Sequence, residues 1–179
     1  MCNDIKTIFA QKIRDFRLPE YSEIPDVGLY LEQVTKYVNG VIEPLGCPVI
    51  TPSMISNYVK QGVVSAPQKK LYGRDHIVYF IFIGIAKTVV SIDDVAMLYR
   101  KQRELYDVPT AYKYFCDEFY NMLMYISGMQ DTVELVGITE SKLKTTLRSV
   151  IMAAANIVFV KNSLAILRES NDEVKIDTQ

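Results

Sequence analysis

The sequence has few of the residues from which metal sites, disulfide frameworks and membrane anchors are built. Its 179 residues include three cysteines, which lie far apart, and one histidine. A zinc site or a disulfide framework is therefore not expected, and a reducing compartment fits best. The longest apolar run, from Ile77 to Ala86, has ten residues, about half of a membrane span. The charged N-terminus also lacks a signal-peptide core, so we expect a cytoplasmic protein that does not cross a membrane.

Motifs that carry catalytic chemistry are also missing. The sequence has no glycine-rich phosphate loop and no constellation of paired carboxylates. The single histidine, His76, lies beside Asp75 at the start of an apolar helix, where a structural or capping role is the favoured interpretation. Cys116 lies among aromatic residues, and a packed core thiol is favoured over metal sensing, which needs several ligands at defined spacing. We therefore expect neither an enzyme nor a cofactor.

The chain as a whole has no excess of positive charge, since its net charge is −1. Taken alone, this value argues against a nucleic-acid-binding protein. The charges are unevenly distributed, however: residues 1–50 carry −2, residues 51–87 carry +4 and residues 88–179 carry −3. A basic segment between acidic flanks is typical of a phosphate-contacting surface, although short charge excesses on solvated faces are common.

Hydrophobic periodicity predicts a mainly helical chain. The expected helices cover residues 5–16, 30–38, 51–62, 75–87, 91–105, 110–126 and 139–168. Thr51-Pro52 is typical of a helix start, and Asn39-Gly40 is expected to end the preceding helix. Two short stretches, Val63-Val64 and Leu71-Tyr72, are predicted to form a hairpin around a basic turn.

The predicted helix that starts at Thr51 has an outer face suited to a DNA groove. Ile55, Tyr58 and Val59 form its buried side. Its solvent side carries, at spacings of three and four residues, Ser53, Ser56, Asn57 and Lys60. These short hydrogen-bonding groups and one long cation suit base edges and phosphates in a major groove. Any surface helix has a solvated face, but here a basic hairpin follows directly, as in a winged helix-turn-helix.

A family resemblance supports this interpretation. The run TPSMISNYVKQGVVSAPQKKLYGRDHI, followed by SIDDVAMLYR, resembles the winged helix-turn-helix of the MerR class of bacterial regulators. The residues that carry the resemblance are Tyr58, Gly62, Pro67, Tyr72 and Ser91. Together with LYLEQV, the run looks like a bacterial family with a MerR-like DNA-binding domain over roughly residues 20–105.

The resemblance implies a mainly α protein: a MerR-like winged helix-turn-helix with a small β-hairpin wing, followed by a C-terminal helical region. We divide the chain into an N-terminal helix (1–19), a MerR-like domain (20–106) and a helical dimerisation or effector region (107–179). The implied function is a homodimeric transcriptional regulator that binds double-stranded DNA through the 51–61 helix and the 63–72 wing. The residues expected to contact DNA are Thr51, Ser53, Ser56, Asn57, Lys60, Lys69, Lys70, Tyr72 and Arg74.

Two alternatives remain open, because this helix has only Lys60 where MerR regulators carry arginines. One is a protein-interaction module on a degenerate helix-turn-helix. The other is a sensor of a small-molecule effector, whose pocket the aromatic residues of the 110–126 helix would line, although core packing explains most of them equally well. These aromatics are Tyr112, Tyr114, Phe115, Phe119, Tyr120 and Tyr125. The last helix is apolar over much of its surface and needs more than one packing partner.

Overall fold

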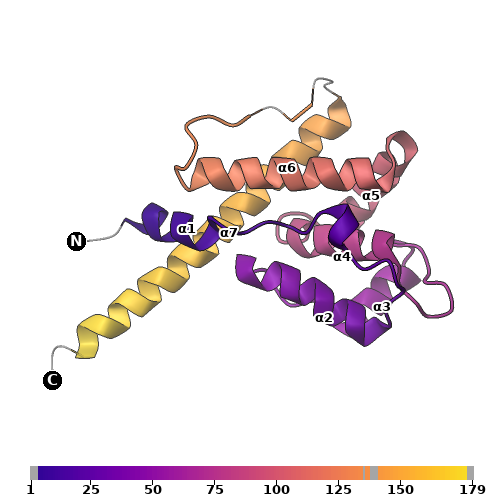
Figure 1. Ribbon diagram of the computed structural model, residues 1–179, viewed down its shortest axis with the longest axis horizontal. Helices are drawn as coiled ribbons and strands as arrows, with labels where there is room; N and C mark the ends of the chain where they lie inside the picture. Colours follow the sequence, from indigo (N-terminus) through magenta and orange to yellow (C-terminus); the bar gives the residue numbers. More distant parts are fainter. Residues whose placement is uncertain (1–3, 135, 138–140, 177–179) are drawn as a thin grey trace.

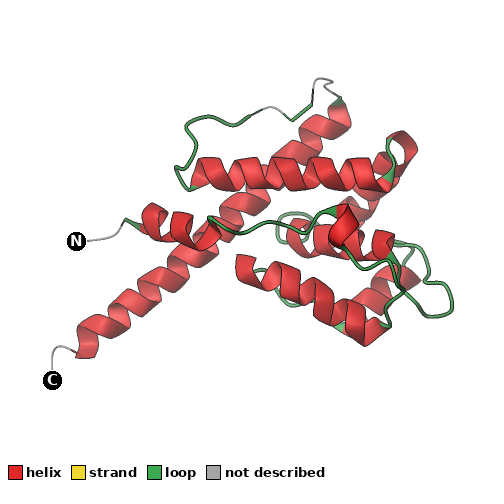
Figure 2. Ribbon diagram, viewed as in Figure 1, coloured by secondary structure: helices red, strands yellow, loops and turns green. Residues whose placement is uncertain are grey.

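The regular elements that the structure describes are all helical (Figures 1 and 2). The computed structural model describes residues 4–134, 136–137 and 141–176, and the side chains among them as far as Glu169. The α-helices in these ranges are α1 (Ile5–Ile13), α2 (Leu31–Ile42), α3 (Pro52–Lys60), α4 (Arg74–Ala86), α5 (Ile92–Leu105), α6 (Val108–Ile126) and α7 (Lys142–Ile176). Two short 3-10 turns, η1 (Tyr21–Glu23) and η2 (Glu43–Leu45), flank α2. The mainly α prediction agrees with this architecture.

The predicted β-hairpin wing is wrong. The described part of the chain contains no strand, and residues 61–73 form a loop with isolated antiparallel bridges only. Gln68 bridges to Leu71 across a tight turn, but Tyr72 pairs outside the loop, with Leu29. The Tyr72 N–H donates to the Leu29 carbonyl at 2.8 Å, and the Leu29 N–H donates to the Tyr72 carbonyl at 2.9 Å. The second limb of the expected hairpin is thus attached to the segment ahead of α2.

The residues of the loop explain why no ladder forms. Val63 and Val64, expected to form the first limb, are buried in the hydrophobic core at 3% and 2% exposure. The next ladder bonds of a hairpin around this turn would join Ala66 and Gly73, but the Gly73 N–H donates to His76 Nδ1 at 3.1 Å instead. The wing is therefore reduced to a single turn on an extended loop.

The end of α2 also differs from the prediction. The helix continues through Asn39-Gly40 to Ile42. The Asn39 side chain instead binds the residue before Thr51: its Nδ2 donates to the Ile50 carbonyl at 2.7 Å, and its Oδ1 accepts from the Ile50 N–H at 2.8 Å. This amide fixes the start of α3 to α2, which sets how the two helices lie against each other.

Replacing Asn39 by alanine is expected to lower the free energy of unfolding by roughly 1–3 kcal/mol, because both polar groups of the buried Ile50 peptide lose their partner. Urea denaturation measures the change. A matched control is Asn57→Ala on α3, whose side chain is exposed and whose loss should cost less than about 0.5 kcal/mol. Equal losses for the two variants would contradict the role given to Asn39.

Helix α7 runs diagonally across the molecule and packs against α1, α4, α5 and α6 (Figure 1). The expectation that it needs more than one packing partner is confirmed within the chain. Its buried residues are Val150, Ile151, Ala154, Ala155, Val158 and Asn162. By length and composition, the span Lys142–Glu169 could cross a membrane, with 33% of its most apolar window buried. Polar residues interrupt the apolar residues of this span, so it contains no single run as long as Ile77–Ala86. The cytoplasmic location stays a prediction.

Candidate nucleic-acid interface

The sequence around α3 fixes which side of the helix faces solvent. Thr51 caps the helix as predicted, since its hydroxyl oxygen accepts a hydrogen bond from the Met54 N–H at 3.2 Å. Pro52 occupies the first turn, where its missing N–H costs nothing. Ile55 and Tyr58 are buried at 0% and 6% exposure. These two anchors turn the opposite side of α3 away from the protein.

That opposite side matches the prediction. Ser53, Ser56, Asn57 and Lys60 are all exposed. Their side chains make no hydrogen bond or ion pair with any other residue that the structure describes. The helix therefore presents four polar groups whose hydrogen-bonding capacity is fully available to a ligand.

The turn that follows carries two exposed lysines in an unusual backbone conformation. Lys69 and Lys70 have positive φ angles of 49° and 67°, and the Leu71 N–H donates to the Gln68 carbonyl at 2.8 Å. Two central residues of positive φ define a type I′ turn, which favours asparagine and glycine. The left-handed conformation costs a residue with a Cβ roughly 1–2 kcal/mol. The turn therefore holds two exposed lysine side chains at a conformational cost.

Tyr72 and Arg74 lie elsewhere than expected. Tyr72 is 6% exposed, and its ring packs against Phe80 with centroids 5.8 Å apart. The Arg74 Nε donates to the Ile24 carbonyl at 2.8 Å, and its guanidinium lies 3.8 Å from the Asp26 carboxylate. Through Leu29, Ile24 and Asp26, these two residues thus hold the segment ahead of α2 against α4. Of the nine expected contacts, the structure places Thr51, the four α3 residues and the two turn lysines at the surface.

The electrostatics of the basic segment follow from these contacts. Of its five basic residues, Lys60, Lys69 and Lys70 are exposed, whereas Arg74 and Lys87 are half-buried. Burial lowers the pKa of Lys87 from its usual value. The positive surface next to α3 therefore rests on three lysines per chain.

His76 and Cys116, the other candidate functional residues in the sequence, have structural roles. His76 Nδ1 accepts from the Gly73 N–H at 3.1 Å, which caps the start of α4. Burial raises the pKa of the Cys116 thiol to about 12, so it is protonated and unreactive near neutral pH. No group of three or more metal-ligating side chains occurs within the described ranges.

A second candidate site is a cavity. A cavity of about 230 Å³ is enclosed by α4, α5, α6 and the start of α7. Three of the six aromatic residues considered above as a possible pocket lining do line this cavity: Tyr112, Tyr114 and Phe115. Its other walls come from α4, α5 and the start of α7, which the sequence did not connect with α6 because the residues lie far apart along the chain.

Comparison with known proteins adds a family. Residues 19–123 match the family described as Domain of unknown function (DUF1836). The chain belongs to this family. The DUF1836 match includes α3, the Lys69-Lys70 turn and the cavity walls from α4, α5 and α6, whereas α1 and α7 lie outside it. No curated protein and no solved structure matches the chain.

Proposed function

We propose that the protein is a DNA-binding transcriptional regulator. The observation that supports this best is the outer face of α3, whose four exposed polar side chains have no partner among the described residues. The exposed lysine turn follows α3 closely in the chain. In this arrangement α3 enters the major groove, and the Lys69-Lys70 turn lies along the phosphate backbone.

Each exposed side chain has a distinct role in this proposal. Asn57 offers an amide that pairs with the N6 and N7 atoms of adenine, and Ser53 and Ser56 donate to or accept from either base type. Thr51 uses its oxygen for the helix cap, which leaves its hydroxyl proton for a phosphate at the helix N-terminus. The lysines bind phosphates as point charges.

Charge reversal tests the proposal. Lys60→Glu should weaken duplex binding at least about tenfold, because a phosphate contact becomes a repulsion. Lys142→Glu on α7 makes the same change of charge at another exposed lysine and should leave affinity nearly unchanged. Fluorescence anisotropy with a labelled duplex measures both. The same loss in both variants would mean that only net charge matters and would overturn the assignment of α3.

A pair of chains is part of the proposal. Beyond its packed middle, α7 continues past the other helices (Figure 1). It carries three exposed apolar side chains at helical spacing, Val160, Leu164 and Leu167, with exposures of 52%, 45% and 46%. Such a stripe is the seam along which two helices pair. Two copies joined there would present two α3 helices to two half-sites.

Sedimentation velocity tests the pairing. Leu164→Arg should shift the chain to a monomer at micromolar concentration, because it places a charge in the seam. Val27→Arg, at a residue that is 71% exposed in the N-terminal loop, serves as control and should sediment like the parent. A parent chain that is monomeric under these conditions would contradict the pairing.

A further inference from the structure

The cavity has rigid aromatic walls. Of the lining residues that the structure describes, seven are tyrosine or phenylalanine. Phe82 of α4 and Phe115 of α6 meet edge to face with centroids 5.2 Å apart, and Tyr79 and Tyr99 do so at 4.1 Å. Rings held in pairs from separate helices keep their orientation, so the space between them stays open.

The size of the cavity limits its occupant. An engineered apolar cavity of about 150 Å³ stays dry and binds benzene. The cavity here measures about 230 Å³, which suits one aromatic ring with a substituent, or two fused rings. Exposed residues, Tyr106 and Thr110, form part of the lining, so a ligand can enter from solvent.

A few polar groups interrupt the apolar walls. Gln102 is buried, its Oε1 accepts from the Tyr79 hydroxyl at 2.7 Å, and its Nε2 donates to the Tyr106 carbonyl at 2.9 Å. Because an amide carries two N–H donors and two lone pairs, one donor and one acceptor site remain. Lys144 of α7 is the only charged residue among the described residues of the lining, with its Nζ 5.2 Å from the centre of the Tyr114 ring.

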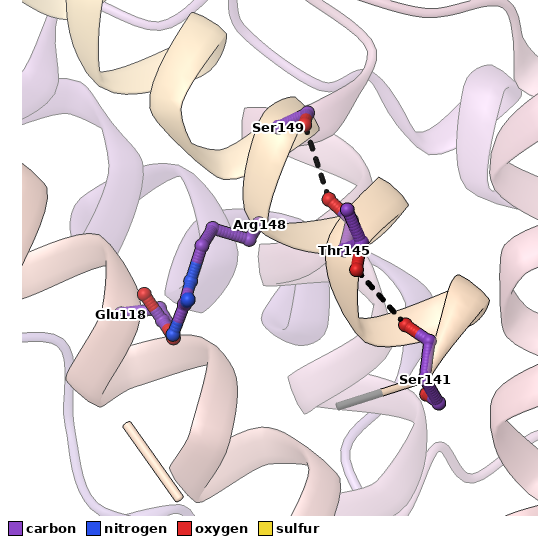
Figure 3. A network of polar contacts seen from close by, with 5 residues as sticks. All are labelled: Glu118, Ser141, Thr145, Arg148 and Ser149. Atoms are coloured by element: carbon purple, nitrogen blue, oxygen red, sulfur yellow. Dashed lines mark hydrogen bonds and ion pairs between the residues drawn. The ribbon is translucent and has the colours of Figure 1, made fainter. Parts of the chain in front are cut away.

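The buried carboxylate of Glu118 does not belong to the cavity lining. Glu118 is 0% exposed and accepts hydrogen bonds from Arg148 across α6 and α7 (Figure 3). Its negative charge is therefore balanced by a guanidinium one helical turn beyond Lys144. The lining itself presents a cation at the edge of an apolar space.

We propose that this cavity binds a small carboxylate with one or two aromatic rings. The rings lie between Phe82, Tyr99 and Phe115, and the carboxylate lies at the ammonium of Lys144. The burial of the rings supplies most of the affinity, and the lysine selects an anion over a neutral compound.

The position of α5 connects this cavity with α3, a step that rests on the proposed function. Tyr99 lines the cavity on one side and, on the other, a surface hollow shared with Val59 and Gly62 at the end of α3. The Tyr99 hydroxyl accepts from Arg103, which lines the same hollow. A ligand that contacts Tyr99 therefore acts on a ring that also forms the wall of the hollow beside α3, so occupancy is expected to change duplex affinity.

Calorimetric titration of the full chain with 2-naphthoate tests the cavity in the absence of DNA. Saturable binding of one molecule per chain is expected, with weaker binding of the neutral isostere 2-naphthamide. Lys144→Gln should weaken 2-naphthoate binding about three- to tenfold and leave 2-naphthamide unchanged. The neighbouring Lys142→Gln is the matched control and should bind both compounds like the parent.

Two further measurements separate the outcomes. Ala111→Phe fills the cavity and should abolish binding of both compounds, with thermal unfolding as the check that the variant folds. Absence of saturable 2-naphthoate binding to the parent, or full affinity in Lys144→Gln, would overturn the proposed site. If the chain binds 2-naphthoate but no duplex, the proposed DNA-binding function fails and the cavity site stands. Duplex affinity that is identical with and without saturating 2-naphthoate would overturn the coupling through Tyr99.

Discussion

Raising the salt concentration from about 50 to 200 mM is expected to weaken duplex binding by a pair of chains roughly a thousandfold. Each chain presents three exposed lysines at the proposed interface: Lys60, Lys69 and Lys70. The other two cations of the basic segment contribute little. Arg74 is bound to the Ile24 carbonyl and lies beside Asp26, and Lys87 is half-buried. Each phosphate that a lysine neutralises releases condensed counterions, and so the affinity falls steeply as salt is added.

The lysine turn should carry most of that salt dependence. Lys69→Gly/Lys70→Gly removes two of the three interface lysines in each chain, and the loss over the same salt range should shrink to roughly tenfold. The same variant should raise the free energy of unfolding by about 1–2 kcal/mol, because glycine adopts the left-handed backbone without strain. Duplex titrations at several salt concentrations and urea denaturation measure the two effects.

The alanine pair separates charge from backbone conformation. Lys69→Ala/Lys70→Ala removes the same charges but keeps a Cβ at both left-handed positions, so it should lose the same affinity without gaining stability. A glycine variant that binds duplex like the parent at every salt concentration would contradict the role of the turn.

Arg148→Met is expected to lower the free energy of unfolding by about 3–5 kcal/mol. Glu118 is 0% exposed, and its Oε1 accepts from Arg148 Nε at 3.0 Å and also from Arg148 Nη2 (Figure 3). Without the guanidinium, the carboxylate is left buried without a counter-charge, which is the costly half of breaking a buried pair.

Two further variants test whether losing the guanidinium costs more stability than losing the carboxylate. Glu118→Leu should cost less, since the side chain of Arg148 is 21% exposed and its charge can reach water. Glu118→Leu/Arg148→Met, which replaces both charges by apolar groups, should come close to the parent or exceed it. Urea denaturation of the three variants measures the cycle. A double variant as unstable as Arg148→Met would show that shape, rather than charge, is what the pair supplies.

Local signals predicted the helices and the faces of α3 well. The Thr51-Pro52 start, the buried Ile55 and Tyr58, and the exposed Asn57 follow from residues within one or two turns of each other. Periodicity and capping act at this range, so the sequence alone is sufficient to infer them.

The predictions that were wrong concern residues whose positions depend on contacts with residues distant in the sequence. Asn39 continues its helix because its amide binds Ile50, and Tyr72 leaves the expected hairpin because it pairs with Leu29. Arg74 is withdrawn from the surface by Ile24, fifty positions earlier. A basic turn is predicted here, but its type I′ geometry does not follow from the sequence, because the usual residues of that turn are asparagine and glycine, whereas Lys69-Lys70 occupies both central positions.

Selection of binding sites from random duplex DNA tests the DNA-binding proposal most directly. The parent chain is expected to enrich a recurring site, repeated in two half-sites if two copies bind together. Asn57→Ala should relax the preference at one position of each half-site, because an amide that reads adenine has been removed. Enrichment of no sequence by the parent at low salt would contradict the proposed function.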